Sequence, residues 1–203
     1  MQENNALFGA VYAITEGTDL WMLTYNTSVL LHFDIAEMKL LDYHMVSKEI
    51  IQAAYSGMAK CGDIIYITPF KKSNLVSFDV MSGEIRYIDI PYEAEEVRRK
   101  NKFVIAAAWK SQLLLVGCGV KGFFYYDTIS ESFTKNTEYW EYLREEGCDV
   151  SNPLFSNTYF QKENKVYLPV RFKDIIFEVD LERREYTIHR LNNDKIALWT
   201  IDG

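Results

Sequence analysis

The chain has 203 residues and a formal charge of −7, with 48% apolar, 25% charged and 15% aromatic residues. Its four prolines and ten glycines are too few for a disordered, collagen-like or proline-rich protein, and no apolar run reaches the roughly 20 residues of a membrane-spanning helix. The acidic balance disfavours a general nucleic-acid-binding or anionic-membrane surface. We expect one large globular domain or two small ones, with no nucleic-acid partner and no membrane partner.

The cysteines and histidines are few and lie far apart in sequence. A disulfide framework needs an even, dense set of cysteines, and a structural zinc site needs clustered Cys or His ligands. Neither pattern occurs among Cys61, Cys118, Cys148, His32, His44 and His189. The opening residues do not match the pattern of a signal peptide. These features predict free thiols, no metal and a cytoplasmic location.

Four segments of the chain align with one another without gaps. Each spans 15 residues, opens with an apolar run, passes through a polar turn into a second apolar run, and ends on aspartate. The segments are Leu20–Asp34, Ile65–Asp79, Leu113–Asp127 and Val166–Asp180. Successive aspartates are 45, 48 and 53 residues apart. This period is near the roughly 40 to 50 residues of a propeller blade and longer than the roughly 33 or 34 of helical repeats.

The aspartate that ends each segment precedes a tight turn. Its carboxylate is expected to accept hydrogen bonds from the turn amides two or three residues further along. A bulky residue stands just before each aspartate and a large one six residues after it, in the pairs Phe33 and Leu40, Phe78 and Ile85, Tyr126 and Phe133, and Val179 and Tyr186. We interpret the four aspartates as architectural, because a position repeated in every unit is more often structural than catalytic.

Each unit is predicted to contain four strands. The predicted first strands are Ala10–Thr15, Tyr55–Lys60, Phe103–Trp109 and Phe155–Gln161. The predicted fourth strands are Lys39–Met45, Glu84–Ile90, Ser132–Lys135 and Tyr186–Leu191. Four strands joined by tight turns and repeated describe an all-β propeller of four-stranded antiparallel blades. We place the blades at about 9–46, 53–91, 102–136 and 153–191, in a single propeller domain over residues 1–203.

Two charged joints, 91–102 and 137–147, separate the later blades, and the second is expected to form a short helix ending at Gly147. Residues 195–201 are predicted to be the first strand of a fifth blade. A lone inner strand would leave backbone groups unpaired. The prediction is therefore an incomplete propeller of four blades and one strand, whose ring is completed by further blades or by another copy of the chain.

The aromatic–Asp pair followed by a large residue six positions on resembles kelch-type repeats, and WD repeats also place an aromatic–Asp pair at the end of the third strand. The resemblance covers residues 10 to 191 and implies a β-propeller. The sequence departs from both patterns, because no Trp-Asp pair occurs and the kelch glycine pair is replaced by Leu23-Thr24, Thr68-Pro69, Val116-Gly117 and Pro169-Val170. The subfamily is left open.

A glycine-rich segment with Gly117, Gly119 and Gly122 matches the G-x-G-x-x-G pattern of dinucleotide sites. Such a site needs a helix next, so that the helix N-terminus meets the pyrophosphate. Here 123–127 has a strand pattern instead. We interpret the glycines as part of a blade hairpin and expect no cofactor.

Basic side chains mark the turns between the second and third strands, at Lys71, Lys72, Lys121, Arg171 and Lys173. In a propeller these turns lie on one face, around the mouth of the central channel. Together they would attract a carboxylate, a phosphate or an acidic partner segment. The alternative is that each is an ordinary solvated turn residue that also discourages edge pairing.

The predicted inner strands carry Tyr12, Trp109 and Tyr159, which would stack on a sugar or planar ligand in the channel or, alternatively, pack between blades. An acidic set is interpreted as a charged linker or helix face and not as a glycosidase pair; it comprises Glu141, Glu145, Glu146 and Asp149. No GxSxG, HExxH or Walker motif occurs, so no catalytic residue is predicted.

Two functions from different classes stay open. The leading hypothesis is a non-catalytic binding module that presents one loop face to a protein partner or a small anionic ligand. The alternative is the catalytic or substrate-binding propeller of a carbohydrate-active enzyme with its site at the channel mouth. A mouth lined by several carboxylates or histidines would favour the enzyme, and a flat face with aromatic and arginine side chains would favour the partner surface.

Overall fold

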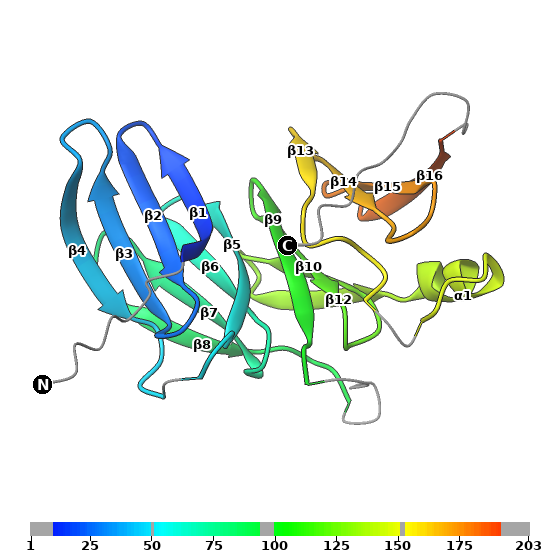
Figure 1. Cartoon of the computed structure of the whole chain (residues 1–203), viewed down its shortest axis with the longest axis horizontal. Coiled ribbons are helices and arrows are strands. Elements are labelled where there is room, and N and C mark those ends of the chain that lie inside the picture. Colours follow the sequence, from blue (N-terminus) through cyan, green and yellow to red (C-terminus); the bar gives the residue numbers. More distant parts are fainter. Residues whose placement is uncertain (1–9, 50, 94–99, 151–152, 192–203) are drawn as a thin grey trace, which may run out of the picture.

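Residues 10–49, 51–93, 100–150 and 153–191 are described by the computed structural model. Within these ranges the chain forms four antiparallel sheets of four strands each, in which neighbouring strands follow chain order, and one short helix. We call the sheets blades 1 to 4. Figure 1 shows them as a row with blades 1 and 4 at its opposite ends.

The blades have the following bounds. Blade 1 consists of β1 (Ala10–Glu16), β2 (Asp19–Thr24), β3 (Val29–Asp34) and β4 (Lys39–Met45), and blade 2 of β5 (Tyr55–Cys61), β6 (Ile64–Pro69), β7 (Asn74–Asp79) and β8 (Ile85–Asp89). Blade 3 consists of β9 (Phe103–Trp109), β10 (Gln112–Gly117), β11 (Phe123–Asp127) and β12 (Ser132–Asn136). Helix α1 (Glu138–Glu145) follows, and blade 4 consists of β13 (Phe160–Lys162), β14 (Lys165–Pro169), β15 (Ile175–Asp180) and β16 (Glu185–Arg190).

The blades pack face to face through three apolar cores, one for each pair of neighbours. Phe78 of blade 2 lies 5.4 Å from Trp21 of blade 1, and Tyr126 of blade 3 lies 5.8 Å from Tyr66 of blade 2, measured between ring centroids. Strands β6, β7, β10 and β11 are therefore buried on both faces, which explains their unbroken apolar runs. Sheets stacked in chain order in this way form a partial β-propeller, as predicted.

The first strands of successive blades lie side by side. Strand β5 lies against both β1 and β9, and a Cβ atom on Gly57 would stand 3.0 Å from the Ala106 amide nitrogen of β9. The Ser56 hydroxyl donates to the Phe103 carbonyl at 2.6 Å across the same contact. Gln161 of β13 donates through its side-chain amide to a β9 carbonyl at 2.6 Å. The inner strands thus adjoin one another as they do around a propeller channel.

Most predicted outer and inner strands match the structure to within one residue, and the exception is the first strand of blade 4. That strand begins at Phe160 instead of Phe155. Phe155 makes an isolated bridge to Val170, and its ring lies 5.5 Å from that of Phe123 in the core between blades 3 and 4. The helix expected in the joint 137–147 is confirmed as α1. The fifth-blade strand predicted at 195–201 lies outside the described residues.

The aspartate turns form as predicted. Asp79 accepts hydrogen bonds from the amides of Met81 and Ser82 at 2.8 and 3.0 Å, and the same two bonds recur in the other blades at Asp34, Asp127 and Asp180. The large residues before and after each aspartate face each other across the third and fourth strands, as Phe78 and Ile85 do. The repeated aspartate is therefore a structural turn residue.

These turns predict sensitivity to acid. Hydrogen bonds from the Ser82 and Met81 amides hold the pKa of Asp79 below its ordinary value. A folded-state pKa below the unfolded one gives stability that is present above the unfolded pKa of about 4 and is lost as pH falls through the folded pKa. We expect Tm to fall between about pH 5 and pH 3. Asp79→Asn, which keeps an acceptor oxygen but does not titrate, should show a smaller fall in circular-dichroism melts. An unchanged slope would contradict the assignment.

A candidate binding face at the blade tips

The turns between second and third strands and the described parts of the connectors between blades lie at one end of the molecule. We call this end the tip face. It is defined by the tips 25–28, 70–73, 118–122 and 170–174 and the connector residues 46–49, 51–54, 90–93, 100–102, 137–150 and 153–159. Backbone hydrogen bonds of 2.7–3.0 Å join it, from Ala53 N to Tyr25 O, Phe70 N to Ala54 O, Lys102 N to Phe70 O, Cys118 N to Lys102 O and Arg171 N to Leu154 O. Because tips and connectors bond to each other alternately, the tip face is a fixed surface.

Three lysines meet at the tip of blade 2. The Lys102 ammonium donates to the carbonyl oxygens of Lys72 at 2.7 Å and Lys71 at 3.3 Å. The Lys71 ammonium donates to the Gln52 carbonyl at 2.8 Å. Lys72 pairs with Glu49, and this hydrogen bond lowers the pKa of Glu49. Partial burial lowers the pKa of Lys102, so a negative group arriving beside it would favour its charged form.

The other predicted basic residues lie near blades 3 and 4 and have different neighbours. The Lys121 ammonium is 3.1 Å from the Glu141 carboxylate on α1. Lys173 donates to the Glu146 carbonyl at 2.9 Å, just beyond that helix. The Arg171 guanidinium stands over the ring of Phe172, 5.4 Å from its centroid. The structure therefore divides the five predicted basic residues into Lys71 and Lys72 at blade 2, Lys121 and Lys173 beside α1, and Arg171 on the blade 4 tip.

Lys102 was not among the predicted site residues. It lies at the end of the charged joint 91–102, whose composition predicts only a connection between blades. Its contact with the blade 2 tip follows from propeller topology, since the first strand of blade 3 starts at the same end of the molecule as the blade 2 tip. The contact of Lys102 could have been predicted from the strand order, because in four-stranded antiparallel blades every such connector begins and ends on the tip face.

The acidic set predicted as a charged helix face takes part in local ion pairs. Glu141 is also 2.6 Å from Arg144, one turn further along α1. Glu146 pairs with Arg190 of β16. These contacts tie the helix to itself and to blade 4. Glu145 is exposed near the helix end.

The three aromatics predicted on inner strands lie at two blade contacts, Tyr12 between blades 1 and 2, and Trp109 and Tyr159 between blades 3 and 4. Tyr12 packs on the core between blades 1 and 2, and burial raises its pKa to about 12. Trp109 packs on the core between blades 3 and 4, with the Lys110 ammonium 5.7 Å from its ring centroid. The Tyr159 hydroxyl donates to the Ala106 carbonyl of β9 at 2.7 Å. Their use in stacking on a ligand stays a prediction.

The glycine-rich segment is a tight blade hairpin. The Gly117 amide donates to the Gly122 carbonyl at 3.0 Å, and a Cβ atom on Gly117 would stand 2.0 Å from the Val120 carbonyl oxygen. Strand β11 begins at Phe123, directly after the last glycine. The segment therefore lacks the helix that a pyrophosphate site needs, and its interpretation as a hairpin is confirmed.

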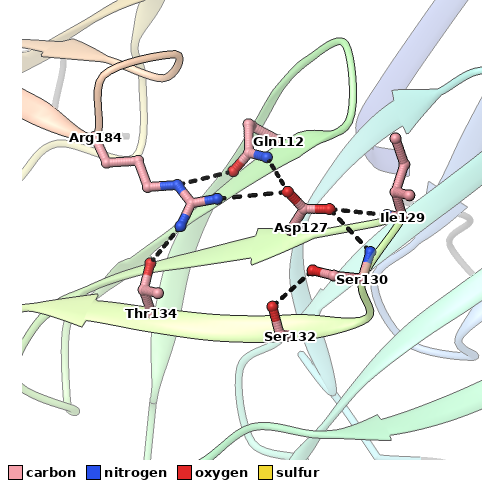
Figure 2. A network of polar contacts seen from close by, with 7 residues as sticks. All are labelled: Gln112, Asp127, Ile129, Ser130, Ser132, Thr134 and Arg184. Carbon is pink, nitrogen blue, oxygen red and sulfur yellow. Dashed lines mark hydrogen bonds and ion pairs between the residues drawn. The ribbon is translucent and has the colours of Figure 1, made fainter.

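A polar network joins blades 3 and 4 at the end opposite the tip face (Figure 2). Arg184, in the β15–β16 turn, donates to Gln112 at 3.1 Å and Thr134 at 3.2 Å and lies 3.5 Å from the Asp127 carboxylate. The Gln112 amide donates to the same carboxylate oxygen at 2.6 Å. Bonds from the Ser130 amide and from Gln112 hold the pKa of Asp127 low. The network fixes one blade on the next.

The histidines lie within the sheets. His32 stacks on Trp21 with ring centroids 3.9 Å apart, and its Nε2 atom is 2.6 Å from Asp19. Among the described residues, no group of three or more His, Cys, Asp or Glu side chains is placed to hold a metal ion. The three cysteines, all in that part of the chain, are free thiols. The helix that the structure describes there is too short to cross a membrane.

No protein-family model and no curated protein sequence matches this chain, but solved structures share its fold. The RRP9 WD40 repeats are 6% identical with a TM-score of 0.66, over 91% of this chain and 52% of that one. The extracellular domain of a hybrid two-component system from B. thetaiotaomicron is 14% identical with a TM-score of 0.58, over 94% and 23%. Glutaminyl cyclase from Myxococcus xanthus is 10% identical with a TM-score of 0.54, over 85% and 66%.

This chain therefore spans less than two thirds of the length of each of these three structures. Likeness at such low identity shows the fold, which is a partial propeller with WD-repeat-like blades.

Proposed function

We propose that this chain is a non-catalytic interaction module whose tip face binds an acidic segment of a protein partner. The observation that carries this proposal is the group of Lys71, Lys72 and Lys102 at the tip of blade 2. Glu49 is the carboxylate paired with this group in the described structure. A protein of net charge −7 that places three lysines around the tip of one blade presents a local attraction for carboxylates.

The rigidity of the tip face supports binding as the function. Its backbone hydrogen bonds hold the tip of blade 2 between the connectors on either side, from Ala54 to Lys102. A surface that is already ordered loses little conformational entropy when a partner arrives. The lysine side chains also gain from a partner, because a carboxylate would offset the partial burial of the Lys102 ammonium.

The enzyme hypothesis has less support from the same structure. His32 and His44 contact the rings of Trp21 and Phe78 within the sheets, away from the tips. His189 pairs with Glu178 on a sheet face of blade 4. The finer assignments belong to this proposal as well: a single kelch-like propeller domain over residues 1–203, in the cytoplasm, supported by the repeat pattern and the free thiols.

A charge reversal tests the tip face. The triple variant Lys71→Glu, Lys72→Glu and Lys102→Glu should raise the Kd for a fluorescent decaglutamate peptide about tenfold or more, which is about 1.4 kcal/mol. Fluorescence anisotropy at low salt measures this, and added salt should weaken the parent complex. The matched control reverses three lysines away from the tip face: Lys39, Lys110 and Lys162.

Equal Kd values for the two triple variants would contradict the proposal. Inorganic phosphate added as a competitor separates two sources of the same chemistry. Displacement of the peptide by millimolar phosphate would indicate a small-anion site, whereas a peptide that stays bound indicates recognition of an extended acidic segment.

A further inference from the structure

The central strands of each blade turn alternate side chains toward the preceding and the following blade. In blades 2, 3 and 4, four aligned residues face the preceding blade, and each is 1% exposed or less. They are Ile65, Ile67, Val76 and Phe78 in blade 2, Leu113, Leu115, Phe124 and Tyr126 in blade 3, and Val166, Leu168, Phe177 and Val179 in blade 4. This column is the surface through which one blade receives the next.

Blade 1 carries the same column, but there it is partly exposed. Its members are Leu20, Met22, Leu31 and Phe33, none of which is buried. Leu20 pairs with Phe33 and Met22 with Leu31 across β2 and β3, so the four share one face, while Trp21 faces blade 2. On β4, Tyr43 pairs with Leu31 and is 63% exposed. We call this apolar surface the open face of blade 1.

A turn residue that contacts the preceding blade in blades 3 and 4 is exposed in blade 1. The turn residue four positions after the repeated aspartate has a positive φ in every blade, and in blades 3 and 4 its side chain contacts the preceding blade. Glu131 of blade 3 pairs with Arg86 of blade 2 at 2.9 Å, and Arg184 of blade 4 joins the Asp127 network of blade 3. The equivalent residue in blade 1 is Met38, which is 86% exposed.

Blade 4 offers the matching surface. Toward the following blade, blades 1 to 3 present an aromatic or apolar residue of the second strand and an apolar residue of the third strand, as Trp21 and Leu30 do in blade 1. The third residue of this set is His32 in blade 1, Ser77 in blade 2 and Tyr125 in blade 3. The aligned residues of blade 4 are Tyr167, Ile176 and Glu178, and all three are partly exposed. Glu178 is paired with Lys165 and His189, so the charges of this face are matched among themselves. Phe160, beside Tyr167, is 63% exposed.

We propose that the open face of blade 1 is covered by blade 4 of a second copy of this chain. The occupant follows from the repeat itself: the interface between neighbouring blades occurs three times among the described residues, and blades 4 and 1 carry its two halves in a partly exposed form. Two copies joined head to tail twice would close a ring of eight blades, which is within the range of about four to eight seen in propellers. This inference does not depend on the function of the tip face.

The first test is the mass of the full chain. Light scattering after size exclusion should give twice the 23.7 kDa of one chain. The double variant Met38→Glu and Tyr43→Glu, on side chains that are exposed in one copy, should give a monomer with an unchanged circular-dichroism spectrum. The matched control, Met81→Glu with Ile129→Glu, changes equally exposed turn residues of blades 2 and 3 and should stay dimeric.

A mixing experiment tests the head-to-tail arrangement. Phe160→Glu, on the blade 4 surface, should also be monomeric alone. Mixing it with the Met38, Tyr43 double variant should restore a dimer, because one intact blade 4 then meets one intact blade 1. A monomeric parent overturns the proposal and indicates that a segment of the same chain covers the face. A dimeric Phe160→Glu with no rescue on mixing also overturns it, in favour of blade 1 pairing with itself.

Discussion

Replacing Tyr139 with alanine should lower the free energy of unfolding by about 3 to 5 kcal/mol, the range for deleting a large aromatic from a core. Tyr139 belongs to α1 but is completely buried between blades 3 and 4. Its ring stacks on Phe123 with centroids 4.1 Å apart and lies 5.5 Å from Phe155 and 6.0 Å from Phe177. Alanine would leave a cavity bounded by three aromatic rings on separate elements, which cannot close by a local movement.

Urea denaturation followed by circular dichroism measures this loss. Tyr139→Phe keeps the ring and its three aromatic contacts, so its effect should stay within about 1 kcal/mol. Glu145→Ala, at an exposed position of the same helix, should stay within about 0.5 kcal/mol. A loss below about 1 kcal/mol for Tyr139→Ala would show that α1 is not part of the core between the blades.

The repeat made most of the fold predictable because the same pattern of apolar strands and aspartate turns occurs four times in the sequence. A strand buried on both faces needs no alternation of polar and apolar residues, so runs such as Leu113–Val116 indicate a sheet placed between two others. The aspartate column fixes where each turn starts, and the pairing of Phe33 with Leu40 or Tyr126 with Phe133 follows from the spacing across that turn. The buried strands, the turn positions and the pairing of third with fourth strands could therefore all be predicted from the sequence.

Blade 4 shows where that reasoning fails. The predicted strand at 155–161 is mostly irregular because Phe155 is drawn into a core that α1 helps to build. The helix lies in a joint rich in charge, and its buried stripe of Tyr139, Trp140 and Leu143 is short. The sequence of the joint alone does not indicate which blade these buried side chains of α1 will contact. Tertiary packing decides it, and the repeat alignment does not extend to an inserted element.

The tip face was predictable in its location but not in its charge balance. The turns between second and third strands carry the basic residues, as the sequence showed, but the partners come from connectors. Lys72 meets Glu49, and Lys121 meets Glu141 on α1. Lys102 reaches the blade 2 tip from the joint that follows that blade. Contacts between segments separated by 20 to 31 residues in sequence depend on how the blades are stacked, which composition and spacing do not encode.

Gly117→Ala should lower the free energy of unfolding by about 3 kcal/mol, the upper range for forcing extra atoms into a packed site. The new Cβ atom would stand 2.0 Å from the Val120 carbonyl oxygen and 2.8 Å from that of Gly122. Both are backbone atoms, and moving them breaks the hydrogen bond from the Gly117 amide to Gly122 at the end of β10. Phe123 follows Gly122 directly and is buried in the core, so the hairpin cannot move outward to relieve the clash.

Gly62→Ala is the matched control for this substitution. Gly62 has a φ of +57° in a blade hairpin, and a Cβ atom there would meet nothing within 4 Å. Its loss should therefore be the conformational cost alone, about 1 kcal/mol. Urea denaturation of both variants separates the two reasons for a glycine. Equal losses of unfolding free energy would mean that Gly117 is required only for its backbone freedom. A larger loss at Gly117 would mean that this first glycine of the G-x-G-x-x-G segment is required because the backbone of the hairpin passes close to it.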